Sequence, residues 1–491
     1  MRDLVRSSSV LAVRQALIGA LGVVRTKVLA VLLGPAGVGL VAQAGQLSVL
    51  TGRLANLGLS NGVAKYTAQY ETEDAPGDLE ALLGGVRWTI VAASAAVVLV
   101  LLGVRQAVST WIFGAPRYAI ALVLVAIATP FAAQGEMAAS VLRGARQFRA
   151  LALAGLAVAL TGVVISVTLV AAFGVQGAFW AIPGTAVATV VVLRFALKRA
   201  VLRPLDVSDR FRLPRRALLG ALMVYGLAAL ASGLSDVVGE LVIRSSLVHR
   251  LGSEANGFYH ASWIVGSQFG ALLGSSLATW GLPTIATLGG DVARVNEVRN
   301  DLLRAYLLAA VPLAVVALLT TPLWIPLLFS GRFLPAAPLL KWQLAAQVVL
   351  GIRAMLNTSL WAHRRLRVFT VLTLSQTAVY LALYFALVGA LGVTAVPVAF
   401  LCSQVAVLIP TAVYLRYAES MRLDRAATRV AATSAVVVTV WIVALAMLGP
   451  GVGRVALGAT TLVWMATNVR RRDLRALWRE FHTLRPAQAE A

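Results

Sequence analysis

Three arginines in the first part of the chain stand among apolar side chains, where a cation has to be paired, hydrated or used. Arg14 and Arg25 are about three helical turns apart, so a helix would place both on one face. Arg53 follows in the next apolar segment. A guanidinium group stays charged and can pair two phosphate oxygens at once. The three side chains therefore indicate an electropositive cavity for an anionic substrate, although snorkelling to lipid headgroups explains Arg14 equally well.

A second set of ionisable residues recurs every four positions, at Asp236, Glu240 and Arg244. A helix would stack the three side chains on one face. Under one interpretation, Glu240 and Arg244 neutralise each other and Asp236 needs another partner or a proton. Under the other, the two carboxylates couple transport to an ion or gate it, and Arg244 binds substrate.

Glu136 stands alone in its apolar segment, between Gly135 and Met137. A lone carboxylate in such a place would be protonated or bind a cation, so Glu136 is a third candidate for ion coupling. The alternative is that the apolar segment ends earlier and Glu136 meets cytoplasmic water.

Motifs for other chemistry are missing. The turn Gly34-Pro35-Ala36-Gly37-Val38-Gly39 lacks the lysine of a nucleotide-binding loop. The four histidines lack the spacing of a zinc site, and Cys402 is expected to pack among apolar neighbours. We therefore predict no metal site and no cofactor, with a proton or sodium ion as the conceivable coupling ion.

The composition shows which elements must hold these residues. Of the 491 residues, 59% are hydrophobic and 13% are charged, whereas soluble domains average about 45–50% and about 25%. An ordinary soluble enzyme is thereby excluded, and membrane-spanning helices of about 20 residues are expected. We predict fourteen spans, at residues 12–33, 38–62, 83–104, 118–140, 150–173, 175–197, 218–246, 257–281, 303–328, 336–361, 368–390, 393–415, 430–449 and 454–469.

Basic residues predict the orientation. The net charge is +23, and most of the 43 Lys and Arg residues fall at the N-terminus, in loops after even-numbered spans and in the tail. Because basic loops stay cytoplasmic, both ends of the chain are predicted to lie in the cytoplasm. The basic segments 198–216 and 470–485 also contain Leu, Trp or Phe, which favours membrane lipid over nucleic acid as their partner.

The chain also repeats itself at an offset of about 218 residues. The matches include Gly34 with Gly252, Gly39 with Gly257, and Gly174 with Gly392. Spans 1–6 thus correspond to spans 7–12, and an even number of spans makes the repeats parallel. We predict an all-α protein with two six-helix lobes, residues 1–216 and 217–428, followed by two extra helices at 429–469 and a basic cytoplasmic tail at 470–491.

Several stretches resemble one known family. They include RTKVLAVLLGPAGVG at residues 25–39, LGLSNGVAKY at 57–66, LRGARQFR at 142–149 and GFYHA at 257–261. The chain is similar to bacterial O-antigen and polysaccharide translocases over residues 10–420. These are Wzx-type flippases of the multidrug/oligosaccharidyl-lipid/polysaccharide exporter superfamily.

That resemblance implies two six-helix lobes around a cavity with alternating access, in the inner membrane of a bacterium. It implies a cargo of undecaprenyl-diphosphate-linked oligosaccharide and polysaccharide polymerase machinery as a partner. The related lipid II flippases use arginines in their first two helices, which correspond to Arg25 and Arg53 here. Those relatives also carry an Arg and a Glu in helix 8 where this chain has Ser262–Gln268, so Arg244 is expected to substitute.

Three functions follow from the sequence. The leading prediction is a flippase, not an enzyme, in which cavity arginines hold the diphosphate. A multidrug or cation exporter of the same superfamily is the second, and its cavity should be dominated by carboxylates and aromatic rings. A polysaccharide polymerase or ligase is the third, but it needs an exposed outer site and the predicted outer loops are short.

Overall fold

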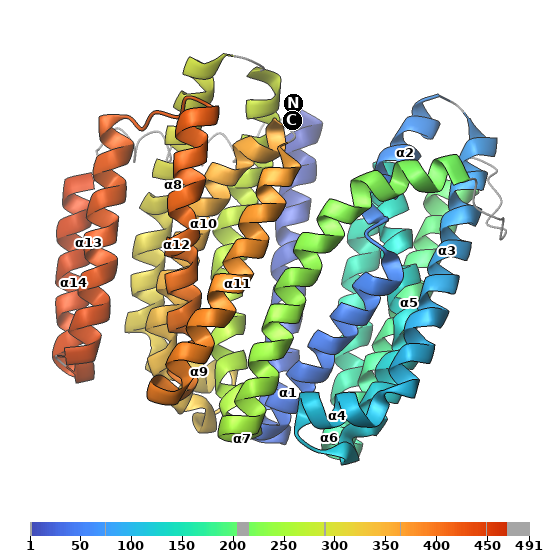
Figure 1. Ribbon diagram of the computed structural model, residues 1–491, viewed down its shortest axis with the longest axis horizontal. Helices are drawn as coiled ribbons and strands as arrows, with labels where there is room; N and C mark the ends of the chain where they lie inside the picture. Colours follow the sequence, from blue (N-terminus) through green and yellow to red (C-terminus); the bar gives the residue numbers. More distant parts are fainter. Residues whose placement is uncertain are drawn as a thin grey trace, which may run out of the picture. The chain divides into compact units, whose positions relative to one another are not determined.

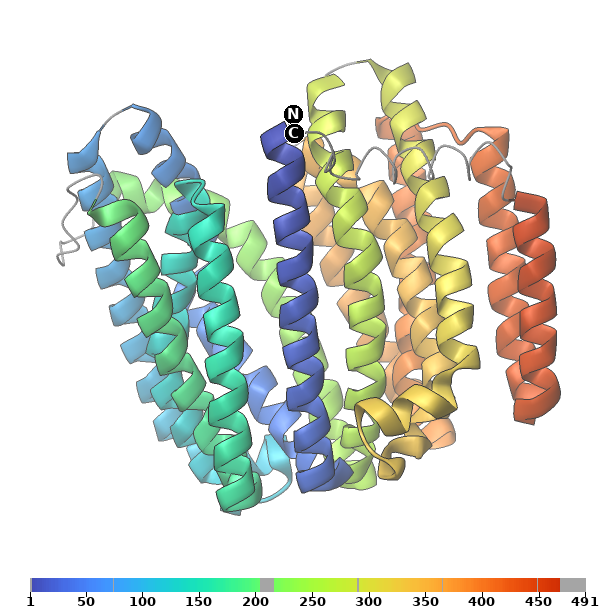
Figure 2. The same ribbon diagram turned by 180° about the vertical axis from the view of Figure 1, so that it is seen from behind.

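The computed structural model describes residues 2–73, 75–203, 216–288, 291–363, 365–447 and 449–468. Within these ranges every regular element is a helix (Figures 1 and 2), which confirms the all-α class. The α-helices are α1 (Arg2–Asn56), α2 (Ser60–Thr72), α3 (Pro76–Gly103), α4 (Arg105–Phe113), α5 (Ala119–Gly144), α6 (Phe148–Leu197), α7 (Arg216–Leu288), α8 (Val292–Leu319), α9 (Thr321–Leu328), α10 (Ala337–Ala362), α11 (Leu366–Leu391), α12 (Ala395–Ala418), α13 (Arg425–Met447) and α14 (Gly449–Asn468). Short turns add η1 (Pro116–Tyr118), η2 (Lys198–Leu202), η3 (Gly331–Ala336) and η4 (Gly392–Thr394).

Glycines in a left-handed conformation divide pairs of spans. Gly34 (φ 64°) interrupts α1, Gly174 (φ 58°) interrupts α6 and Gly252 (φ 85°) interrupts α7. Gly392 (φ 55°) stands between α11 and α12. Only glycine adopts such angles without a Cβ penalty. Gly34 matches Gly252 and Gly174 matches Gly392 in the predicted repeat, so the two halves turn at equivalent places.

The described helices are those of a multi-pass membrane protein. Eight helical stretches in the described ranges are long and apolar enough to cross a bilayer, and three of them contain 40, 55 and 53 residues. A single crossing needs about 20 residues, so each of these three can hold two spans.

Some predicted boundaries were wrong. The span predicted at 303–328 is α8, which starts at Val292 and ends at Leu319, followed by the separate α9. The first turns of α8 are polar, so a count of apolar residues places its start too late. The Asp291 carboxylate caps this end by accepting a hydrogen bond from the Arg294 backbone amide. The second span ends at Asn56 rather than at residue 62, and the short helices α2 and α4 were not anticipated.

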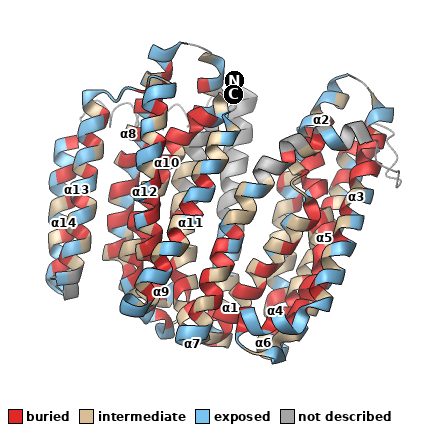
Figure 3. Cartoon of the chain, in the orientation of Figure 1, coloured by how far each residue is buried: buried red, intermediate tan, exposed pale blue. Residues whose placement is uncertain are grey.

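Residues 10–260 with 326–333 form one compact unit. Within it, α5 packs against α2, α3, α4 and α6. Much of α5 is buried, including Leu122, Val125 and Leu142, whereas residues such as Val164, Phe173 and Val191 of α6 are exposed (Figure 3). A buried helix surrounded by helices with apolar outer faces is the arrangement expected where lipid is the solvent.

The described residues within 1–9, 261–325 and 334–468 form the other compact unit. Here α10 packs against α8, α11, α12 and α13, and α13 and α14 pair with each other. Cys402 is exposed on α12, so the expectation that it packs inside was wrong. The units divide within α7, so the predicted lobe boundary at residue 216 stays a prediction, and the tail at 470–491 lies outside the described residues.

Candidate functional site

Arg25 lies in the first segment of α1 and is partly buried. Its Nε atom is buried and has no hydrogen-bond partner. A buried donor without an acceptor costs about 1–3 kcal/mol, and more when the group is charged. Among the described residues, the Nε donor of Arg25 is therefore unsatisfied. Arg14 belongs to the same segment, but its side chain lies outside the described residues.

Arg53 ends the second segment of α1 and is exposed. Its guanidinium donates to the carbonyl oxygen of Gly233 on α7. A Cβ at position 233 would lie 2.8 Å from the Arg53 Nη1, so glycine leaves room for the contact. Asp236 follows on α7 and is also exposed. No described contact joins Arg25 to Arg53.

Glu240 and Arg244 form the predicted pair. The Arg244 Nε lies 2.8 Å from the Glu240 Oε1, and the two side chains are 3% and 8% exposed. The hydroxyl of Tyr259 donates to the Glu240 Oε2 at 3.0 Å, and the Arg244 guanidinium lies 4.8 Å from the centre of the Tyr259 ring. The contact is the one that the pairing interpretation predicts, and Arg244 is buried against Glu240, Asn256 and Tyr259.

The same network joins the two sequence repeats. The Arg244 Nη1 donates to the Asn256 Oδ1 at 3.0 Å. The Asn256 amide donates to the Gly39 carbonyl at 2.8 Å and to the Gln43 Oε1 at 3.0 Å. We call this junction the inter-repeat seam, because Gly39 and Gln43 belong to the first repeat whereas Arg244 and Asn256 belong to the second. The buried amides of Gln43 and Asn256 were not predicted from the sequence, since single amides give no spacing signal.

Glu136 does not stand alone, and that expectation was wrong. The Arg143 Nη2 lies 2.7 Å from the Glu136 Oε1, and the side chains are 42% and 49% exposed. The two residues are seven apart on α5, which brings them to one face after two helical turns. The half-exposed position fits the alternative that Glu136 meets water.

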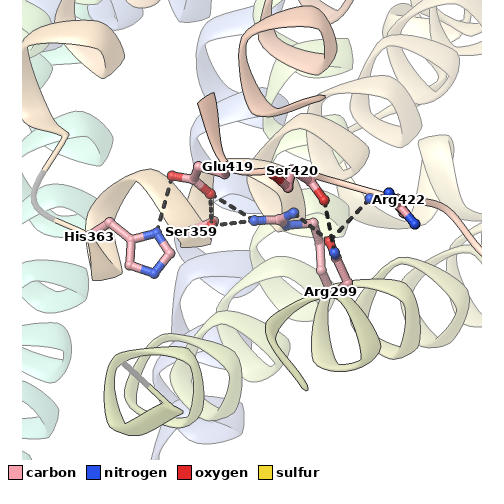
Figure 4. A network of polar contacts seen from close by, with 7 residues as sticks. Arg299, Ser359, His363, Glu419, Ser420 and Arg422 are labelled. Carbon is pink, nitrogen blue, oxygen red and sulfur yellow. Dashed lines mark hydrogen bonds and ion pairs between the residues drawn. The ribbon is translucent and has the colours of Figure 1, made fainter. Parts of the chain in front are cut away.

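A second buried ionic network lies in the other compact unit (Figure 4). The Glu419 carboxylate, directly after α12, accepts from the Arg299 Nη2 of α8 at 2.7 Å. It also accepts from the Ser359 hydroxyl of α10, and the His363 Nδ1 lies 3.1 Å from its other oxygen. Arg299 and Glu419 are 1% and 7% exposed, so this network ties three helices together at one end.

Sequence analysis missed this network for a physical reason. Glu419 and His363 follow the ends of spans, where charged residues usually mark the membrane surface. The connecting segment after α12 is held by further hydrogen bonds: the Asn296 amide donates to the Ser420 carbonyl, and the Asn300 amide to the Arg422 carbonyl, each at 3.0 Å. Nothing in the local sequence distinguishes the residues of this network from charged residues that only mark the membrane surface.

Solved structures define the class of this fold. An inward-facing multidrug-resistance transporter of the MATE family and MOP superfamily superposes with a TM-score of 0.71 at 15% identity, covering 83% of this chain and 94% of that one. The lipid II flippase MurJ, in its inward closed conformation, superposes with a TM-score of 0.70 at 13% identity, covering 94% of this chain and 99% of that one. The chain therefore shares its fold with these two proteins.

Sequence comparison identifies the family. The family described as polysaccharide biosynthesis proteins matches residues 28–338, which is more than half of the chain, so this protein belongs to it. Lipid III flippases from Escherichia coli (strain K12) and Shigella flexneri are each 28% identical over 334 residues, covering 67% of this chain and 78% of theirs. The resemblance found in the sequence is confirmed.

Proposed function

We propose that this protein is a flippase for polyprenyl-diphosphate-linked oligosaccharide, working by alternating access. It would serve surface polysaccharide assembly from the bacterial inner membrane, with both chain termini in the cytoplasm. Membership of a polysaccharide biosynthesis family supports this cargo class. The similarity to lipid III flippases supports lipid-linked transport in particular.

The observation that carries the proposal is the unsatisfied Nε donor of Arg25. Keeping a charged residue in a membrane span costs about 2.5–3.5 kcal/mol on insertion scales, and such residues usually mark a pathway. A diphosphate would accept hydrogen bonds from Arg25 with bidentate geometry. Arg53 would join it by exchanging its bond to the Gly233 carbonyl for a bond to phosphate.

The site chemistry favours this function over a multidrug exporter. A cation would be repelled by Arg25 and Arg53, and the deeply buried Glu240 is already paired with Arg244. Asp236, exposed on α7, and Glu136, which pairs with Arg143, both remain candidates for ion coupling. Polymerase or ligase activity has no supporting cluster among the described residues.

The test is transport of a lipid-linked saccharide by the purified full-length protein in liposomes. Arg25→Ala and Arg53→Ala should each lower the flipping rate at least about tenfold, because one charge-assisted hydrogen bond contributes about 1.5–3 kcal/mol. Lysine at either position should restore part of the rate. It keeps the positive charge but cannot make the bidentate hydrogen bonds of a guanidinium group. Arg367→Ala is the control, because Arg367 is exposed at the start of α11.

Full transport by both alanine variants would refute the assignment of the diphosphate site. Failure of the wild-type protein to move any polyprenyl-diphosphate saccharide, with transport of organic cations instead, would refute the flippase. For coupling, Asp236→Asn should abolish the response to an imposed proton or sodium gradient, and an unchanged response would dismiss Asp236.

A further inference from the structure

A polar cavity lies beside the inter-repeat seam, within the compact unit of residues 10–260. Its volume is about 310 Å³, and its polar lining includes Arg117, Tyr118, His249 and Ser253. Leu40, next to the seam residue Gly39, also contributes to the wall. The first repeat and the second repeat thus each supply part of this cavity.

The side chains around the cavity present hydrogen-bond donors. Arg117 is exposed, and its described contacts are with Tyr118: Nη2 lies 3.2 Å from the phenol oxygen, and the guanidinium lies 5.0 Å from the ring centre. No described carboxylate pairs with Arg117. The His249 Nδ1 lies 2.9 Å from the Ser245 carbonyl, which can only accept, so Nδ1 carries the hydrogen and Nε2 of the neutral ring is an acceptor.

Three carbonyl groups near the cavity already accept hydrogen bonds. At the end of α4, the carbonyl of Trp111 accepts from the Ser245 hydroxyl, and the carbonyl of Ile112 accepts from the Gln43 amide at 2.6 Å. The carbonyl of Ala115 accepts from the Ser109 hydroxyl at 2.8 Å. Side chains therefore cap the carbonyls that would make this end of α4 electronegative. A cavity with free donors, a cation and occupied acceptors suits an oxyanion.

We infer that this cavity binds a phosphoryl oxyanion, with Arg117 as its main ligand and Tyr118 and Ser253 as further donors. Guanidinium forks match the geometry of phosphate oxygens, and the volume accommodates a diphosphate-sized group. In the orientation proposed above, residues 104–118 and 247–256 follow odd-numbered spans and face the outer side. The anion would come from the exported lipid-linked saccharide or from a phospholipid headgroup.

Binding at this cavity would stabilise the closed seam. The walls belong to α1, α4, η1 and α7, and the Ser253 carbonyl lies against Gly39 at the crossing of α1 and α7. A ligand that contacts both repeats binds best when they are together, so occupancy favours the closed arrangement. This part of the inference rests on the proposed transport function, whereas the anion site does not.

The experiment measures binding of inorganic pyrophosphate to the full-length protein in phosphatidylcholine nanodiscs, at constant ionic strength. Arg117→Gln should weaken binding at least about tenfold, because it removes the charged ligand. Arg105→Gln is the matched control, because Arg105 is an exposed arginine of α4 outside the cavity lining. The Arg117 side chain is exposed, so its replacement should leave thermal unfolding unchanged.

A second arm identifies the source of the anion. If a phospholipid headgroup is the natural ligand, phosphatidylglycerol in the nanodisc should compete with pyrophosphate in the wild-type protein. If the exported lipid is the source, phosphatidylglycerol should not compete, and Arg117→Gln should slow release of the saccharide at the outer side. Either result supports an oxyanion site.

Unchanged pyrophosphate binding in Arg117→Gln, or an equal loss in Arg105→Gln, would overturn the inference, as would a wild-type protein that binds no pyrophosphate. That failure is separable from failure of the proposed function. A wild-type protein that flips the lipid-linked saccharide while Arg117→Gln binds pyrophosphate normally would leave the flippase intact and remove this site.

Discussion

A close backbone approach between α1 and α7 at Gly39 gives the sharpest prediction. A Cβ added at Gly39 would lie 2.8 Å from the Gly257 nitrogen and nearer still to the Ser253 carbonyl oxygen. Both neighbours are backbone atoms of α7, so they cannot move aside as a flexible side chain could. Gly39→Ala must therefore push α1 and α7 apart. Overpacking of this kind costs about 1–3 kcal/mol, which is about a 5- to 150-fold change in the equilibrium of the closed seam.

Thermal unfolding of the purified protein measures that cost. A loss of about 1–3 kcal/mol should lower the unfolding midpoint by about 2–12 °C for a unit of this size. Gly45→Ala is the matched control on the same helix, because a Cβ at Gly45 would meet nothing within 4 Å. Gly257→Ala should resemble Gly39→Ala, since its Cβ would lie 2.6 Å from the Pro35 carbonyl carbon. Equal midpoints for Gly39→Ala and Gly45→Ala would refute the reasoning.

Two further predictions concern the ion pairs. Glu240→Ala leaves the Arg244 cation buried without its carboxylate partner, so the free energy of unfolding should fall by about 3–5 kcal/mol. Glu136→Ala should lower it by at most about 1 kcal/mol, because the Glu136–Arg143 pair is half exposed. A chemical-denaturation series on both variants measures the contrast, and equal losses would contradict it. Arg299→Ala should also lower the free energy of unfolding by about 3–5 kcal/mol, because the Glu419 carboxylate stays buried without its arginine partner. Adding Glu419→Ala to that variant should recover part of the lost free energy. Strict additivity in that cycle would show that the two groups do not interact in solution.

Much of the fold was predictable because lipid imposes simple rules. Apolar segments of a given length must be helical in a membrane, since each backbone group needs a partner within its own segment. The structure also agrees with the repeat offset, because Gly34 and Gly252, and likewise Gly174 and Gly392, adopt left-handed angles at the turns between spans. Helix ends such as that of α8 were less predictable, because polar turns continue a helix beyond the apolar region.

For the site, the sequence by itself determined the charge types and their helical spacing, and it offered the pairing of Glu240 with Arg244 as one of two interpretations. A single helix carries that pair, so local geometry suffices. The tertiary structure alone decided that Arg244 is also held by Asn256, that Glu136 meets Arg143 at its exposed surface, and that Glu419 joins α8 to α10. Those contacts depend on which helix faces pack together, and side chains far apart in the chain leave no periodic signal of their meeting.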